Sequence, residues 1–220
     1  MQPWTRQFID LALEAGALKF GRYTLKSGRV SPYFFNAGAF CSGRLLGAVA
    51  DAYADAIVDA MVDAGVEFDL LFGPAYKGIP LAATVAASLW QRHRIDIPVA
   101  YNRKEAKDHG EGGSLVGAPL AGRVLVVDDV ISAGTAFADA RARIEQAGAH
   151  IVALAIGLDR QERAGDGMQG AARALADQGI RVVAVARLDD LIAALQTGPR
   201  SNSSMLSAML DYRERYGVGS

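Results

Sequence analysis

The sequence has little cysteine, no long apolar run and no excess of basic residues. Cys41 is the only cysteine among the 220 residues, so an intrachain disulfide is excluded and a cytoplasmic location is expected. No apolar stretch approaches the roughly 20 residues of a transmembrane helix, and the N-terminus lacks a signal-peptide layout, so we expect no membrane partner. The formal net charge of -1 offers no basic surface, so we expect no nucleic-acid partner.

Strand patterns and helix patterns alternate along most of the chain. About half of the residues are apolar, which is enough for a substantial core. We expect strands over 69–73, 97–101, 123–127, 151–158 and 180–186, and helices over 43–64, 79–91, 136–147, 171–178, 188–196 and 204–215. This alternation predicts an α/β fold with a central, mainly parallel sheet flanked by helices.

The first 40 residues depart from that alternation. An amphipathic helix over 3–15 precedes a predicted hairpin over 21–36 that turns near Gly28. We therefore expect residues 1–40 to form an N-terminal helix and hairpin hood, and residues 41–220 to form the α/β core. A long polar stretch over 102–118 interrupts the core, and its length and glycines predict a mobile loop that acts as a lid.

The stretch from Val124 to Ala136 organises the rest of the chain. An apolar, β-branched run typical of a buried strand leads to Asp128 and Asp129, then to a loop of small residues and a helix. Free backbone N–H groups and the positive end of the helix dipole form an anion site there. Two carboxylates would repel a phosphate alone, so they indicate a phosphorylated sugar with hydroxyl groups and a divalent cation. The plain alternative is a βα turn with a capping aspartate.

Two further segments bring positive charge close to predicted strand ends. The run 72–80 contains two glycines and two prolines, which demand a special backbone path, and it carries Lys77. In the polar stretch after the next strand, Arg103, Lys104, Lys107 and His109 supply further positive charge. Both segments suit a diphosphate. Their plain alternatives are a tight turn with a solvated lysine and a disordered charged loop.

The run Val-Val-Asp-Asp-Val-Ile-Ser-Ala-Gly-Thr-Ala, residues 126–136, resembles the phosphoribosyl-pyrophosphate (PRPP) motif of the type I phosphoribosyltransferases. The run Gly-Pro-Ala-Tyr-Lys-Gly, residues 73–78, resembles the diphosphate loop of the orotate phosphoribosyltransferases. By that resemblance, a non-proline cis peptide bond would fall at Ala75–Tyr76. Residues 103–109 resemble the catalytic loop of the same family.

Positions at both ends of the match resemble the base-binding part of that family. They are Lys26, Phe34 and Phe35 in the hairpin and Arg160 after a predicted strand. In a strand, Phe34 and Phe35 face opposite sides, so one is expected in the core and the other toward ligand. Without the resemblance, Arg160 would be taken for a solvated surface arginine. Ser132 departs from the threonine common in the family, but it keeps the hydroxyl group.

The resemblance implies a glycosyltransferase of pyrimidine biosynthesis. It would transfer the 5-phosphoribosyl group of PRPP to orotate and release orotidine 5′-monophosphate and diphosphate. Because the PRPP motif alone does not name the base, another base-specific phosphoribosyltransferase stays an alternative. A PRPP-sensing regulator that binds the ligand without turnover is the alternative from a different class.

The resemblance also implies three groups of site residues. The catalytic residues would be Lys104, Lys107, His109, Asp128 and Asp129. PRPP would be bound by Lys26, Tyr76, Lys77, Arg103, Lys104, Lys107, His109, Asp128, Asp129, Val130, Ile131, Ser132, Ala133, Gly134, Thr135 and Ala136. Orotate would be bound by Lys26, Phe34, Phe35, Ser132 and Arg160.

The implied cofactor is Mg²⁺, which would bridge the diphosphate and the ribose hydroxyl groups. It would be held largely through substrate and water, so no residue is assigned as a direct metal ligand. The implied assembly is a homodimer with shared active sites, in which the lid of one subunit reaches the site of its partner.

Overall fold

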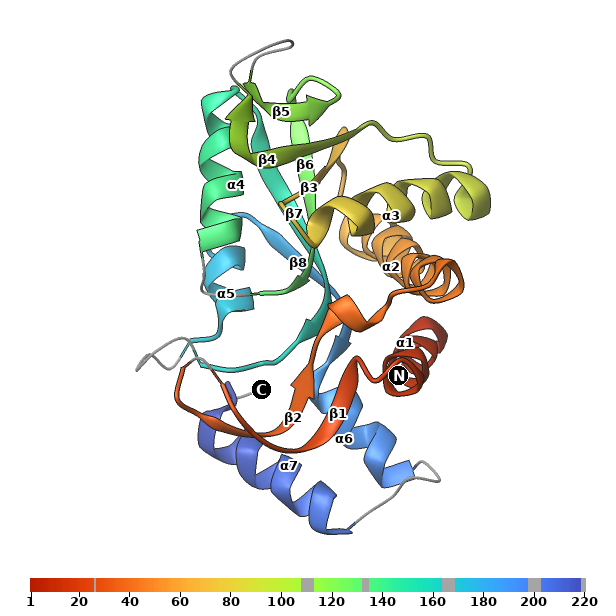
Figure 1. The fold of residues 1–220 in the computed structure, drawn as a ribbon, viewed down its shortest axis with the longest axis vertical. Coiled ribbons are helices and arrows are strands. Elements are labelled where there is room, and N and C mark those ends of the chain that lie inside the picture. The colour runs from red at the N-terminus through yellow and green to blue at the C-terminus, as the bar shows by residue number, and fades with distance from the viewer. Residues whose placement is uncertain (26, 108–112, 132–134, 164–168, 198–202, 219–220) are drawn as a thin grey trace.

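A six-stranded sheet forms the centre of the part of the chain that the computed structural model describes, residues 1–25, 27–107, 113–131, 135–163, 169–197 and 203–218 (Figure 1). Its strands lie in the order β5-β4-β3-β6-β7-β8. Their bounds are β3 Leu70–Gly73, β4 Val99–Lys107, β5 Gly113–Gly117, β6 Arg123–Val130, β7 His150–Asp159 and β8 Arg181–Arg187. Neighbours run parallel, except that β5 is antiparallel to β4. The predicted α/β fold with a mainly parallel sheet is confirmed.

Helices cover both faces of this sheet (Figure 1). One face packs against α1 Pro3–Glu14, α2 Gly43–Ala64, α3 Gly78–His93 and α6 Leu188–Thr197, and the other against α4 Thr135–Gln146 and α5 Ala171–Ala176. The helix α7 Ser203–Tyr216 packs against α6 and the hairpin. Within the described residues, no helix is long and apolar enough to cross a membrane.

The strand β6 shows why this sheet is buried on both faces. Leu125 and Val127 belong to the core under α2 and α3, while Val124 and Val126 belong to the core under α4. The side-chain period of two therefore sends alternate residues into separate cores. We predicted that the strand ends at 127, which is wrong: β6 continues to Val130 because its backbone still pairs with β7.

Local sequence signals set several element ends. The side chain of Ser42 caps α2 by accepting a hydrogen bond from the Leu45 N–H at 3.3 Å, and Gly65 ends the helix with a left-handed φ of 62°.

The helix α1 covers the edge strand β8, where the Thr5 hydroxyl donates to the Val185 carbonyl at 2.7 Å. This contact protects an edge that would otherwise be open to pairing.

The hairpin forms its own two-stranded antiparallel sheet, β1 Leu18–Thr24 and β2 Val30–Phe35, beside α7 (Figure 1). Phe35 packs against the ring of Phe8 at a centroid distance of 6.0 Å. Phe34 lies on the opposite side and is 41% exposed. The prediction that the two rings face opposite sides is confirmed.

The polar stretch 102–118 is more regular than we expected. Its two ends continue β4 and form β5, with Tyr101 opposite Val116 and Asn102 opposite Leu115. Backbone groups make this ladder, so it tolerates polar side chains at the edge of the sheet. Residues 108–112, in the middle of the predicted loop, lie outside the described residues.

Two glycines make a matched test of packing near the centre of the fold. A Cβ at Gly157 in β7 would lie 2.8 Å from the Tyr53 hydroxyl and 2.9 Å from Phe8 Cζ, whereas a Cβ at Gly47 in α2 would meet nothing within 4 Å. We expect Gly157→Ala to lower the free energy of unfolding by about 1–3 kcal/mol through overpacking. Gly47→Ala should raise it by about 0.5–1 kcal/mol, because alanine favours a helix. Urea unfolding measures both, and equal effects would contradict this account.

Candidate active site

The carboxyl ends of β3, β6 and β7 meet along one edge of the sheet, where ligands of open α/β sheets bind. Lys77 follows β3, the pair Asp128 and Asp129 lies at the end of β6, and Arg160 follows β7. Sequence patterns singled out Lys77 and the two aspartates, and the family resemblance singled out Arg160. The sheet order brings their strands side by side.

Lys77 and Asp129 form the ion pair at the centre of this edge. The Lys77 Nζ lies 2.7 Å from Asp129 Oδ2. The carboxylate is buried, with the residue 7% exposed, and its other oxygen accepts a hydrogen bond from the Val130 N–H at 3.0 Å. The lysine side chain remains about half exposed at the start of α3. A cation is thus held where the sheet presents its acids.

Asp128 lies beside this ion pair, and its carboxyl group is largely shielded from water although it stands at the end of a strand. Burial, and next the negative charge of Asp129, raise its pKa from 3.8 to about 7. Its Oδ1 accepts a hydrogen bond from the Asp129 N–H at 2.8 Å. From α2, the buried Tyr53 hydroxyl donates to the Asp128 carbonyl at 2.8 Å and so fixes the backbone of the acid pair. No sequence pattern pointed to Tyr53.

The turn between β3 and α3 has the special path that its glycines and prolines predicted. The peptide bond Ala75–Tyr76 is cis, where the resemblance places it. The Ala75 N–H donates to Oδ1 of the buried Asn102 at 3.0 Å. A Cβ at Gly73 would lie 2.4 Å from the Gly78 carbonyl oxygen, so only glycine allows this close approach. Asn102 was missed as a positioning residue because the contact joins two distant segments.

The predicted phosphate loop joins β6 to α4. Ser132, Ala133 and Gly134 lie outside the described residues, as do the side chains of Thr135 and Ala136. Val130 and Ile131 are half-buried, and they pack against the cores on opposite faces of the sheet. Their side chains therefore anchor the loop entrance on both faces of the sheet.

The predicted lid residues are only partly described. Arg103 is half-buried on β4. Lys104 and Lys107 belong to the same strand, but their side chains lie outside the described ones, and His109 lies outside the described residues altogether.

At the other end of the site, Arg160 follows β7 and turns toward the hairpin. Its guanidinium carbon lies 4.3 Å from the centroid of the Tyr33 ring, and its Nε donates to Glu162 Oε1 at 2.7 Å. With its side chain only 17% exposed, Arg160 is not the solvated surface arginine of the plain alternative. Lys26, the other predicted cation here, lies outside the described residues.

The chain is similar to known proteins over almost its full length. A family model described as phosphoribosyl transferase domain matches residues 43–188. Orotate phosphoribosyltransferase from Cronobacter sakazakii is 52% identical over 218 residues, covering 99% of this chain and 100% of that protein. The one from Chromohalobacter salexigens is 51% identical and covers 99% of this chain and 97% of that protein.

A solved structure extends this similarity to the fold. Orotate phosphoribosyltransferase from Francisella tularensis superposes with a TM-score of 0.83 at 39% identity, over 96% of this chain and 98% of that one. The chain therefore belongs to the phosphoribosyl transferase family and, within it, to the orotate phosphoribosyltransferases, which act in pyrimidine biosynthesis.

Proposed function

We propose that PRPP and orotate react above the cluster of Lys77, Asp128 and Asp129. The observation that supports this most is the 2.7 Å ion pair between Lys77 and the buried Asp129 at the ends of neighbouring strands. Displacement at the anomeric carbon leaves a highly charged diphosphate and builds positive charge on the sugar ring. A lysine beside two carboxylates offers complementary charge for both halves of that reaction.

The two acids serve the ribose. Their carboxylates would accept hydrogen bonds from the ribose hydroxyl groups and lie close to the developing positive charge. The backbone of this pair is held by Tyr53 and by pairing of β6 with β7, so the acids need little reorganisation during the reaction. Lys77 neutralises Asp129 in the structure, and a bound diphosphate would offer it a second anion.

The remaining charge of PRPP is shared between the phosphate loop and the lid. Residues 130–136 would hold the 5′-phosphate through backbone N–H groups and the N-terminus of α4. Tyr76, Lys77 and Arg103, together with Lys26, Lys104, Lys107 and His109, would face the diphosphate. The lid over 102–118 is proposed to be mobile and to close over bound substrate, with Lys104, Lys107 and His109 acting on the leaving group.

Mg²⁺ suits this donor set only as a substrate-bound ion. Among the described residues, no three His, Cys, Asp or Glu side chains gather into a metal site. Mg²⁺ commonly keeps several waters and takes one or two carboxylates plus substrate phosphates, and Asp128 and Asp129 fit that mode. When bound, the ion would supply charge neutralisation for the diphosphate.

Orotate is placed at the hairpin end of the site. Its carboxylate and carbonyl groups need donors, and Arg160, Lys26, Ser132 and the backbone at Phe34 and Phe35 would supply them. This makes residues 1–40 the hood over a PRPP-binding core of residues 41–220. The enzyme is proposed to work in the cytoplasm, as a homodimer in which each lid serves the partner's site.

Replacing the acids tests the central assignment. We expect Asp128→Asn and Asp129→Asn each to lower kcat by about 10²–10³-fold, because each removes charge beside the developing cation while keeping the size of the side chain. The matched control is Asp10→Asn on the exposed face of α1, which should leave turnover unchanged. Steady-state kinetics with PRPP, Mg²⁺ and orotate measure all three. Near wild-type turnover in both site variants would remove the assignment.

The raised pKa of Asp128 predicts a pH-dependent stability. An acid whose pKa is raised by folding from 3.8 to about 7 costs stability as pH rises through that window, because the folded state then has to release a proton that it holds more tightly. Asp128→Asn removes this cost. We expect its gain in the free energy of unfolding over wild type to be larger at about pH 8 than at about pH 5, by at most about 3 kcal/mol, with Tm rising accordingly. Asp129→Asn removes the neighbouring negative charge but also the ion pair with Lys77, so its gain at about pH 8 should be smaller than that of Asp128→Asn. An equal Tm change at both pH values would contradict the burial of Asp128.

Subunit mixing tests the shared site. One inactive variant carries Asp128→Asn with Asp129→Asn, and the other carries Lys104→Ala with Lys107→Ala. In a mixed dimer with crossed lids, one site receives both defects and the other receives neither. Random exchange should then restore roughly a quarter of wild-type activity. No recovery after verified exchange would show that each lid serves its own chain.

A further inference from the structure

Three segments that are far apart in the sequence meet around the side chain of Arg160. Its Nε donates to Glu162 Oε1 at 2.7 Å, and its Nη2 lies 3.2 Å from the Ser31 hydroxyl and 3.4 Å from the Tyr212 hydroxyl. The ring of Tyr33 covers one face of the guanidinium at 4.3 Å. The hood strand β2, the segment after β7 and the C-terminal helix α7 thus hold one cation.

The hydrogen bonds in this cluster run in defined directions. The Ser31 hydroxyl donates to the Tyr33 carbonyl at 2.7 Å, so it is an acceptor toward Arg160. The Tyr212 hydroxyl donates to Glu162 Oε1 at 2.7 Å, so it too is an acceptor toward Arg160. Burial and the bond to Glu162 raise the pKa of Tyr212, which favours the protonated, donating form. Each hydroxyl therefore donates its own proton to another group and can only accept a hydrogen bond from Arg160.

Glu162 is the centre of this arrangement. Its Oε1 receives both the Arg160 guanidinium and the Tyr212 hydroxyl, and its Oε2 lies 3.5 Å from Nη1 of Arg29 in the hood. The Glu162 side chain is 18% exposed, so it holds these groups in a partly desolvated place where charge-assisted bonds are strong. We call Glu162 and Tyr212, with the contacts they make to Arg160, the arginine clamp.

The backbone that carries the clamp is also fixed. Gln161 adopts a left-handed φ of 51°, and its side chain exchanges two hydrogen bonds with Asp189 at the start of α6, at 2.9 and 3.0 Å. The next residues pair with the end of α7, because the Arg163 N–H donates to the Tyr216 carbonyl at 2.9 Å. Helices α6 and α7 together set the course of the segment that presents Arg160.

The clamp leaves one part of the guanidinium available. Within the described residues, Nε and Nη2 have protein acceptors and Nη1 has none. A long arginine side chain loses much rotamer freedom when it binds a ligand. Because two nitrogens of Arg160 are already held by the protein, binding a ligand through the third nitrogen costs little further conformational entropy.

We propose that Glu162 and Tyr212 are positioning residues that orient Arg160 toward the carboxylate of orotate, so that the C-terminal helix α7 takes part in choosing the base. This inference rests on the proposed role of Arg160 in binding orotate. Neither residue needs to touch the substrate. Replacing them should weaken binding only of ligands that carry the carboxylate, and it should have no further effect in a variant that lacks the Arg160 side chain.

Nucleotide binding measures this effect without turnover. Orotidine 5′-monophosphate carries the carboxylate, and uridine 5′-monophosphate lacks it, so the ratio of their Kd values reports carboxylate recognition alone. By calorimetry, Arg160→Ala should lower this selectivity by at least about tenfold, as expected for loss of a charged hydrogen bond. Tyr212→Phe and Glu162→Gln should each lower it by about fivefold, through weaker binding of the carboxylate-bearing nucleotide only.

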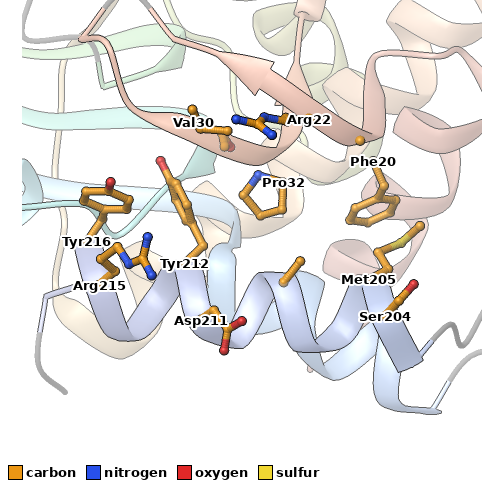
Figure 2. Close-up of a pocket in the computed structure, with 13 residues that line it drawn as sticks. Phe20, Arg22, Val30, Pro32, Ser204, Met205, Asp211, Tyr212, Arg215 and Tyr216 are labelled. Atoms are coloured by element: carbon orange, nitrogen blue, oxygen red, sulfur yellow. The ribbon is translucent and has the colours of Figure 1, made fainter.

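The chain offers a matched control for Tyr212→Phe. Tyr216 lies one turn further along α7, and its ring packs against that of Tyr212 in a tilted arrangement at a centroid distance of 5.1 Å. Both rings line a cavity of about 530 Å³ between the hairpin and α7 (Figure 2). Figure 2 shows the Tyr212 side chain rising from α7 toward the hood strand that carries Val30 and Pro32. Because Tyr216→Phe removes a hydroxyl from the same wall without touching Arg160, it should keep wild-type selectivity.

A double variant separates positioning from packing. If Tyr212 acts through Arg160, then Arg160→Ala with Tyr212→Phe should have the selectivity of Arg160→Ala alone. If Glu162→Gln does not fold, the comparison of Tyr212→Phe with Tyr216→Phe still tests the proposal. Equal weakening of both nucleotides, or wild-type selectivity in Tyr212→Phe while Arg160→Ala loses it, would overturn the clamp and leave the role of Arg160 standing. Wild-type selectivity in Arg160→Ala would overturn both.

Discussion

The negative charge of two adjacent aspartates at the buried end of β6 is the constraint on which the site depends. Carboxylates removed from water need partners or must give up their charge. Asp129 takes Lys77 as its partner, and the raised pKa of Asp128 shows the second solution. To deliver Lys77 there, the chain must turn sharply after β3, which requires close backbone approach at Gly73 and an acceptor from Asn102.

Local signals in the sequence predicted much of the fold. Ser42 and Gly65 mark the ends of α2 correctly because capping and left-handed backbone depend on the residues themselves. The ends of β6 and β4 were wrong for the opposite reason. A strand continues as long as a neighbour pairs with it: Asp128 pairs with Ile156 on a strand beyond the next helix, and Asn102 pairs with Leu115 on the following strand. No local pattern encodes such a partner.

The same distinction separates the site residues that were found from those that were missed. Lys77, Asp128 and Asp129 stand at or next to strand ends, where a charged residue after an apolar run is visible in the sequence, and Arg160 was found through the family resemblance. Tyr53 and Tyr212 act from helices, Asn102 acts on the turn that leads to Lys77, and Glu162 lies two positions after Arg160. In the sequence alone these four look like ordinary core or surface positions, and only the assembled contacts give them a role.

The two ends of the site are therefore built in different ways. The PRPP end rests on one continuous run through β6 into α4, so a single motif can identify the superfamily. The proposed base end is assembled from β2, the segment after β7 and α7. Ser31 and Arg160 are 129 positions apart, and Glu162 and Tyr212 are 50 positions apart. A change in any one of these segments can alter the base end while the run through β6 stays intact. In the proposed arrangement, base choice is the property that the hood and the C-terminal helix can tune without disturbing the chemistry on the sheet.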